Sequence, residues 1–198
     1  MRLAAPVVAG TPLRVLQARD EALYCALYGD PEAMRHVGAV LTVERARAAF
    51  ARVMDQLAAR PPRVAYWLLP RRVDAGVDVP PAGLLALQAG PDADDHAEVG
   101  VLLPRDAQGA GVASAGIAAL ADVVFTSTAL PALWTRHARG NAAAGALMRR
   151  LGFQVAVQDI AGECRWQLTR ARWAQLRGNP AVQAGRATGT GRGMQETW

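Results

Sequence analysis

The chain has 198 residues, of which 52% are hydrophobic and 20% charged, enough for one domain with a sizeable core and too few for two full domains. No apolar run approaches the roughly 20 residues of a membrane span, and the first residues, MRLAAPVVAG, lack the features of a secretory signal. The net charge is +5, without a concentrated basic stripe. We therefore expect a cytoplasmic protein, a monomer or homodimer, that binds neither nucleic acid nor a membrane.

The first half of the chain predicts one strand followed by two helical segments. Residues 11–20 (TPLRVLQARD) alternate apolar and polar side chains and predict the strand. Apolar residues at helical intervals predict a helical stretch over 20–38, interrupted by a turn at 29–31. Thr42 is a suitable N-cap for a second helix, which the prolines at 61 and 62 end.

The second half predicts six more strands and two helices. Strands are expected at 63–70, 83–89 and 97–104, with a turn at 90–96 before the third. A helix to about Phe125, a strand at 131–138, a helix at 138–152 ended by Gly152, and a hairpin of 153–158 and 163–171 complete the order. From Asn179 the chain is rich in Gly, so we expect a single domain over 1–178 and a flexible tail over 179–198.

A glycine-rich turn, RDAQGAGVAS (105–114), lies between a predicted strand and a predicted helix. Such turns bind phosphates, because free backbone N–H groups and the positive end of the helix dipole point outward there. A P-loop is excluded because it requires Lys and the chain has none. A dinucleotide fingerprint fits poorly, because Ser114 stands where Gly or Ala is needed and no acidic residue lies between Asp122 and Asp159.

Gln108, Gly111 and Ala113 fit the pattern Q/R-x-x-G-x-G/A, and RGNAAAGALMRRLGF downstream places an Asn before a helix that ends in Leu-Gly-Phe. With these motifs and the predicted element order, residues 12–172 resemble the GNAT N-acetyltransferase superfamily. The stretches DPEAMRHVG and TVERARAAF resemble its RimJ/RimL-type subgroup, which acetylates the N-terminal amines of ribosomal proteins. The resemblance implies an α/β (α+β) GNAT fold, with a mixed, mostly antiparallel sheet flanked by helices and splayed fourth and fifth strands.

The resemblance also implies acetyl-CoA as the acyl donor and assigns its contacts. Backbone groups of the fourth strand and the side chain of an Asn would bind pantetheine, and the glycine-rich turn would bind the pyrophosphate. The residues concerned are Val101, Leu102, Leu103 and Asn141 for pantetheine, and Gln108, Gly109, Ala110, Gly111, Val112, Ala113 and Ser114 for the pyrophosphate. Arg136, Arg139, Arg149 and Arg150 lie in a stretch without acidic residues, which suits a ligand with several phosphate charges.

Amide formation from a thioester requires a base for the amine and benefits from an acid for the thiolate. Strand alternation puts Glu98 on the face opposite Val99, so Glu98 is the first candidate for the base. His137 is the second, because imidazole titrates near neutral pH. Met148 and Ala144 stand where the family often has Tyr and Ser, so the thiolate would leave with help from water or backbone N–H groups.

The resemblance favours acetyl transfer by direct attack in a ternary complex, with a protein or peptide N-terminus as acceptor. A small amine, such as a polyamine or an aminoglycoside, is an alternative acceptor, and a non-catalytic acyl-CoA-binding module is an alternative function. The sequence does not choose among acceptors, because the two early helices and the closing hairpin carry no recognisable code. Cys25 and Cys164 are far apart and unpaired by any motif, so neither a disulfide nor a metal site is expected.

Overall fold

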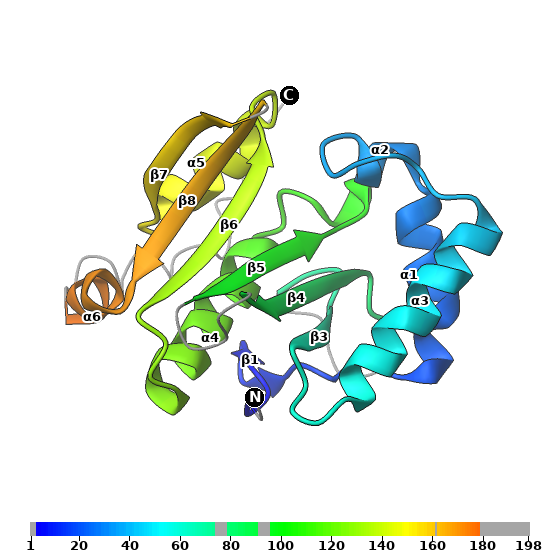
Figure 1. The fold of residues 1–198 in the computed structure, drawn as a ribbon, viewed down its shortest axis with the longest axis horizontal. Helices are drawn as coiled ribbons and strands as arrows, with labels where there is room; N and C mark the ends of the chain where they lie inside the picture. The colour runs from blue at the N-terminus through cyan, green and yellow to red at the C-terminus, as the bar shows by residue number, and fades with distance from the viewer. Residues whose placement is uncertain (1–2, 74–78, 91–95, 161, 179–198) are drawn as a thin grey trace, which may run out of the picture.

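The structure is a computed structural model that describes residues 3–73, 79–90, 96–160 and 162–178 (Figure 1). Its elements follow the predicted alternation of strands and helices, with additions at both ends. In chain order they are β1 (Val7–Val8), β2 (Thr11–Pro12), α1 (Glu21–Gly29), α2 (Pro31–Met34), α3 (Val43–Ala58), β3 (Val64–Leu69), β4 (Gly83–Ala89), β5 (Ala97–Leu102), α4 (Val112–Ser127), β6 (Ala132–Ala138), α5 (Ala142–Arg150), β7 (Gln154–Ile160), β8 (Glu163–Thr169) and α6 (Arg170–Gly178).

The central sheet has six strands in the order β3-β4-β5-β6-β8-β7. All neighbours are antiparallel except β5 and β6, which are parallel. The β5–β6 register contains only the pairs Ala97↔Leu133 and Glu98↔Trp134. Beyond Glu98 the two strands separate, so the mixed, mostly antiparallel sheet with a splay between these strands is confirmed.

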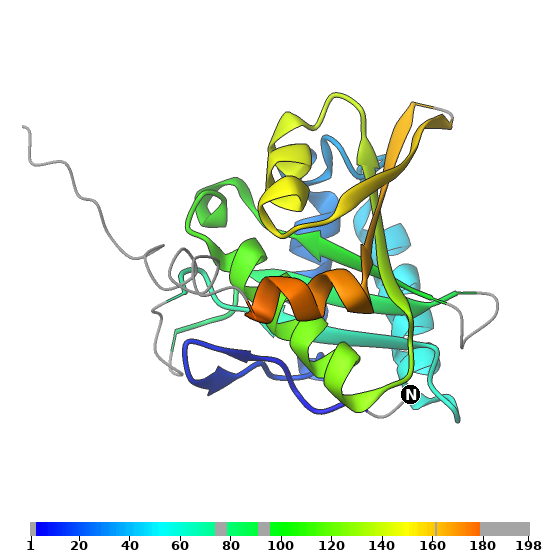
Figure 2. The same ribbon diagram turned by 90° about the vertical axis from the view of Figure 1, so that its left-hand side faces the viewer.

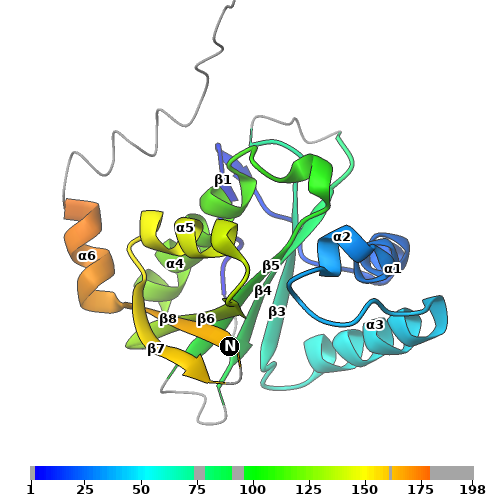
Figure 3. The same cartoon turned by 90° about the horizontal axis from the view of Figure 1, so that it is seen from above.

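Helices cover both faces of the sheet, and the strand alternation decides which side chains each layer buries (Figure 3). Leu68, Leu84 and Leu102 pack with the buried residues of α1 and α3. Leu69 and Val99 point the other way, into the core formed with α4. We call these two sides of the sheet the α1 face and the α4 face.

The first predicted strand, at 11–20, is wrong in extent. Thr11–Pro12 pairs with Val7–Val8 in a two-stranded hairpin, and Val15 then makes a single antiparallel bridge to Trp67 of β3. The alternation breaks because Leu13 and Leu16 are both buried. Regular pairing stops before Asp20, whose carboxylate accepts from the backbone N–H of Gln17 at 2.8 Å.

Two boundaries in the second half also differ from the prediction. The helix expected at 138–152 begins only at Ala142, because β6 continues through Ala138. The last strand ends at Thr169, and α6 follows it, packed against α4 (Figure 2). The ring of Trp173 lies 6.4 Å from that of Phe125, and its Nε1 donates to Asp122 at 3.1 Å. The predicted tail at 179–198 lies outside the described residues.

Candidate active site

The glycine-rich turn leads directly into α4 and is shaped by two left-handed residues. Gly109 has φ +78° and Gly111, the N-cap of α4, has φ +77°, a conformation that favours glycine. Among the described residues no side chain caps this helix, and its first turn has no acidic residue. The first backbone N–H groups of α4 therefore keep their hydrogen-bonding capacity, beside the positive end of the helix dipole.

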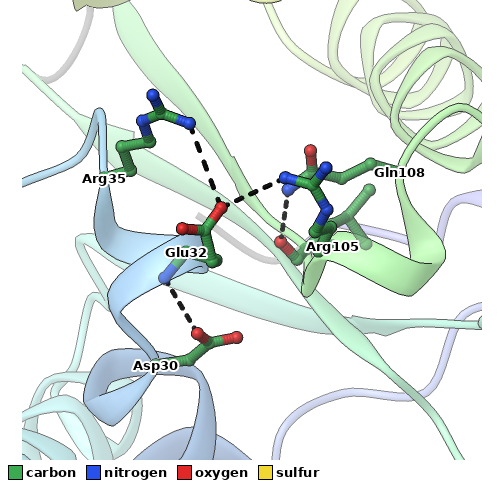
Figure 4. A network of polar contacts seen from close by, with 6 residues as sticks. Asp30, Glu32, Arg35, Arg105 and Gln108 are labelled. Atoms are coloured by element: carbon green, nitrogen blue, oxygen red, sulfur yellow. Dashed lines mark hydrogen bonds and ion pairs between the residues drawn. The ribbon is translucent and has the colours of Figure 1, made fainter.

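Polar contacts fasten the segment before this turn to other parts of the fold (Figure 4). The side chain of Gln108 donates to the carbonyl of Leu103 at 3.1 Å, within the segment itself. Arg105 donates to Glu32 of α2 at 3.2 Å, and Arg71, after β3, is paired with Asp106. The segment before the predicted phosphate-binding turn is thus attached both to α2 and to the chain that follows β3.

The contact of Arg105 with Glu32 belongs to a small network on α2. Arg35 lies 4.0 Å from the same carboxylate oxygen, Oε2, and the backbone N–H of Glu32 donates to the Asp30 side chain at 2.9 Å (Figure 4). The charged side chains are exposed, so these pairs orient the segment more than they stabilise it. The sequence did not predict the contact, because its partners are 73 residues apart.

One edge of β5 is open where the strands separate. Val101 and Leu102 are paired with Leu85 and Leu84 of β4, but within the described chain no strand pairs with them on the β6 side. Backbone N–H and C=O groups that point toward β6 are therefore available to an extended ligand. A side chain at Gly100 would meet no described atom within 4 Å, so the space above this strand is open on the α1 face.

The residues predicted to bind coenzyme A on the β6 side of the splay have contacts of their own within the fold. Asn141, predicted to contact pantetheine, caps α5 by accepting from the Ala144 N–H at 3.0 Å. Arg149 lies over the ring of Trp166 at 5.9 Å, whereas Arg136 points to the α1 face. Arg136 and Arg149 therefore do not share one anion site.

Glu98, the first predicted base, is held by an arginine of the neighbouring strand. Its Oε1 accepts a hydrogen bond from Nε of Arg136 at 3.0 Å, and Arg136 also contacts Glu163 at 3.5 Å. The side chain of Glu98 is 44% exposed, and its Oε2 has no partner in the part of the chain that the structure describes. This oxygen is free to accept a proton.

A hollow of about 390 Å³ borders Glu98 on the α1 face, between the end of α3 and the β4–β5 hairpin. Its polar lining consists of two amides, one arginine, one histidine and one carboxylate. The residues that line it are Gln56, Ala59, Arg63, Val64, Gln88, Ala89, Gly90, His96 and Glu98.

His137, the second predicted base, lies on the α4 face, on the opposite side of the sheet from Glu98. Its Nδ1 is 2.9 Å from the carbonyl of Ala138, and its Nε2 accepts from the indole N–H of Trp166 at 2.9 Å. These contacts fit the tautomer that carries its proton on Nδ1. His137 would have to give up the Trp166 contact before it could accept a proton, and the structure does not bring it together with Glu98.

The two positions on α5 where the resemblance would put a proton donor carry Met148 and Ala144. Met148 is 4% exposed and packs in the core of the α4 face, and Ala144 has no acidic group.

A tyrosine cluster on the α1 face was not predicted from the sequence. The rings of Tyr24 and Tyr28 stack at 4.4 Å, and Tyr66 of β3 lies in register with Ala86 and Gly100. Burial, with the neighbouring Tyr28, raises the pKa of Tyr66 to about 12, and burial also raises the pKa of Tyr24 and of Tyr28. All three hydroxyls therefore stay protonated at neutral pH. The four-residue spacing of the first two tyrosines was the available signal.

Within the described ranges, no group of three or more His, Cys, Asp or Glu side chains is arranged to hold a metal ion. In the same residues, no helix has both the length and the apolar character to cross a membrane.

Comparison with known proteins defines the class. The family model described as "Acetyltransferase (GNAT) domain" matches residues 12–154. The chain therefore belongs to the GNAT acetyltransferase family. No curated protein sequence matches it.

Solved structures share the fold at low sequence identity. A structure described as apo FdhC, a nucleotide-linked sugar GNAT, is 13% identical with a TM-score of 0.69, covering 94% of this chain and 97% of the other. RimL, a ribosomal L7/L12 alpha-N-protein acetyltransferase in complex with coenzyme A, is 17% identical with a TM-score of 0.67, covering 83% and 97%. Spermidine N-acetyltransferase from Vibrio cholerae, in complex with CoA and spermine, is 17% identical with a TM-score of 0.64, covering 82% and 96%. These three proteins are described with different substrates, namely a nucleotide-linked sugar, ribosomal L7/L12 and spermidine, so the shared fold does not choose an acceptor.

Proposed function

We propose that this protein transfers the acetyl group of acetyl-CoA to a primary amine by direct attack in a ternary complex. The observation that carries the proposal is the continuity of two features. The open edge of β5 runs into the segment that ends at the uncapped N-terminus of α4. An extended arm with a pyrophosphate at one end matches an open strand edge followed by an anion-binding helix terminus.

The pantetheine arm and the pyrophosphate of coenzyme A each have proposed partners. Backbone groups of Val101, Leu102 and Leu103 pair with the pantetheine arm, and the side-chain amide of Asn141 reaches it from across the splay. Backbone N–H groups of residues 108–114 bind the pyrophosphate, and Gln108 supports them through its hydrogen bond to Leu103.

Glu98 is the proposed general base. As the amine nitrogen attacks the thioester carbon, Oε2 of Glu98 takes the proton directly or through a water, the C–S bond breaks, and CoA leaves as the thiolate. Oε1 stays bound to Arg136, which fixes the direction of the carboxylate. His137 remains the second candidate, and the occupied state of its Nε2 makes Glu98 the preferred one.

The thiolate is stabilised by water or backbone N–H groups, because no proton donor stands at Met148 or Ala144. The resemblance to RimJ/RimL-type enzymes supports a protein or peptide N-terminus as the acceptor. A polyamine or an aminoglycoside is the alternative acceptor, and an acyl-CoA-binding module without catalysis is the alternative function. We place the protein in the cytoplasm, as a monomer or homodimer.

Release of free thiol from acetyl-CoA, measured with a panel of peptides and small amines, tests the proposal. Acceptor-dependent release that falls roughly 10²- to 10⁴-fold in Glu98→Gln supports it. Glu163→Gln is the matched control, because it removes a neighbouring carboxylate that also contacts Arg136. Acetyl-CoA binding without release for any amine would instead indicate the non-catalytic module.

A further inference from the structure

Two arginines lie opposite each other on adjacent strands, on the same face of the sheet as Glu98. Arg136 of β6 and Arg165 of β8 are register partners, and side chains at such a pair point to the same face. That face is the α1 face, because Arg136 contacts Glu98 there. Like charges directly opposite each other destabilise a sheet unless something neutralises them.

Among the described side chains, the carboxylates at this pair contact only Arg136. Glu98 and Glu163 both contact Arg136, at 3.0 and 3.5 Å. Arg165 is exposed, and among the described residues it has no ion-pair or hydrogen-bonding partner. An anion on this side of the splay would complete the charge balance of the pair.

We infer that the acceptor is a peptide N-terminus followed closely by an acidic residue, and that Arg165 binds its carboxylate. This inference rests on the proposed acetyl transfer. A guanidinium matches a carboxylate because its N–H groups form two parallel hydrogen bonds with the two oxygens. A polyamine, by contrast, would bring further positive charge to the arginine pair.

The sheet geometry fixes how far the acid lies from the amine. Adjacent strands are about 4.8 Å apart. Arg165 on β8 lies two strands away from Glu98 on β5, and it is offset by the two residues from Trp134 to Arg136 along β6. The two positions are therefore on the order of 10 Å apart. An extended peptide advances about 3.3 Å per residue. An amine at Glu98 therefore places the third or fourth residue of the peptide beside Arg165.

The test uses two lysine-free peptides, so that the N-terminus is the only primary amine. They differ only in Asp or Asn at the third and fourth positions, and acetylation is measured as kcat/KM at low and high salt. We expect the full chain to prefer the Asp peptide roughly 3- to 10-fold, mainly through KM, with the preference shrinking at high salt. Arg165→Gln should bring the ratio of kcat/KM for the Asp peptide to that for the Asn peptide near one. Arg165→Glu should prefer a third peptide, with Arg at the same two positions, over the Asp peptide.

Arg177→Gln, on α6 at the other side of the sheet, is the control and should keep the ratio of the parent chain. Equal acetylation of the Asp and Asn peptides by the parent chain would overturn the inference while leaving acetyl transfer intact. Failure to acetylate either peptide, with acetylation of a small amine, would overturn both the peptide acceptor and this inference. An unchanged ratio in Arg165→Glu would exclude Arg165 as the contact.

Discussion

Arg136 reaches back along the sheet to hold Glu98, its Nε lying 3.0 Å from Oε1. The last register pair of the two strands is Glu98↔Trp134, so the ion pair bridges β5 and β6 at the point where they separate. One oxygen of the proposed base is fixed by this contact, and the other has no partner among the described residues. Arg136 is therefore a positioning residue for Glu98.

Arg136→Gln should lower kcat more than it changes KM for acetyl-CoA, because the base loses its orientation while the proposed cofactor contacts stay in place. We expect a loss of roughly 10-fold, partly restored in Arg136→Lys. Steady-state kinetics with varied acetyl-CoA measure this split. A rise in KM for acetyl-CoA with unchanged kcat would mean that Arg136 binds the cofactor instead.

Gly111→Ala should weaken acetyl-CoA binding beyond its effect on folding. Its φ of +77° strains any other residue by about 1–2 kcal/mol, and the strain falls on the N–H groups that are proposed to bind the pyrophosphate. Gly10→Ala is matched, because Gly10 has φ +81° with no described atom near a new Cβ. Calorimetry should give similar losses of stability for both variants and a roughly 10-fold weaker Kd for Gly111→Ala alone. Equal Kd values of Gly111→Ala and Gly10→Ala for acetyl-CoA would show that the turn is not part of the binding site.

Asp20 should make the stability of the fold fall in acid. Burial disfavours the charge of its carboxyl, but hydrogen bonds from Arg14 and the Gln17 amide outweigh this and hold its pKa below the usual value. Because the folded-state pKa is depressed, its contribution is complete above the unfolded pKa of about 3.9 and is lost as the pH falls through the folded value.

Asp20→Asn should therefore cost about 2 kcal/mol at neutral pH, and the difference from the parent chain should shrink below about pH 4. Urea unfolding at pH 7 and at pH 3 measures both quantities. If the two chains differ in unfolding free energy by the same amount at pH 7 and at pH 3, the destabilisation in Asp20→Asn comes from packing and not from the charge of Asp20.

Arg170 should be a large contributor to stability at the α4–β6 corner. Its guanidinium donates to the carbonyls of Phe125, Thr128 and Leu130, the last two at 2.6 and 2.8 Å. Arg170→Met leaves these acceptors unpaired and should cost about 2–3 kcal/mol. Arg47→Met, which breaks the exposed pair with Glu21, should cost about 0–1 kcal/mol. Similar melting temperatures for the two variants would refute this role.

The sequence predicted the elements whose signals are local. The turn at Gly111 and the outward position of Glu98 each depend on neighbouring residues, and the structure has the turn and the strand face as expected. The helix α6 was missed because only Trp173 in it is buried, too little for a periodic pattern.

Contacts between distant residues were beyond prediction. The link of Arg136 to Glu98 and the facing pair with Arg165 depend on strand order and register. The lack of acidic residues between Asp122 and Asp159 suggested a phosphate as the partner of Arg136. Its partners in the structure, Glu98 and Glu163, both lie outside that stretch. The occupied Nε2 of His137 depends in the same way on Trp166 of β8.

Acetyl-CoA is proposed to bind along β5 and at the N-terminus of α4, and thermal unfolding with and without acetyl-CoA measures this binding. At 100 times the Kd, a ligand that binds only the folded state adds about 2.7 kcal/mol, which raises the Tm by roughly 5–11 °C for a chain of this size. We predict this rise with acetyl-CoA, a smaller one in Gly111→Ala, and none with NADH or ATP. No rise with acetyl-CoA, or an equal rise with the two nucleotides, would contradict the account.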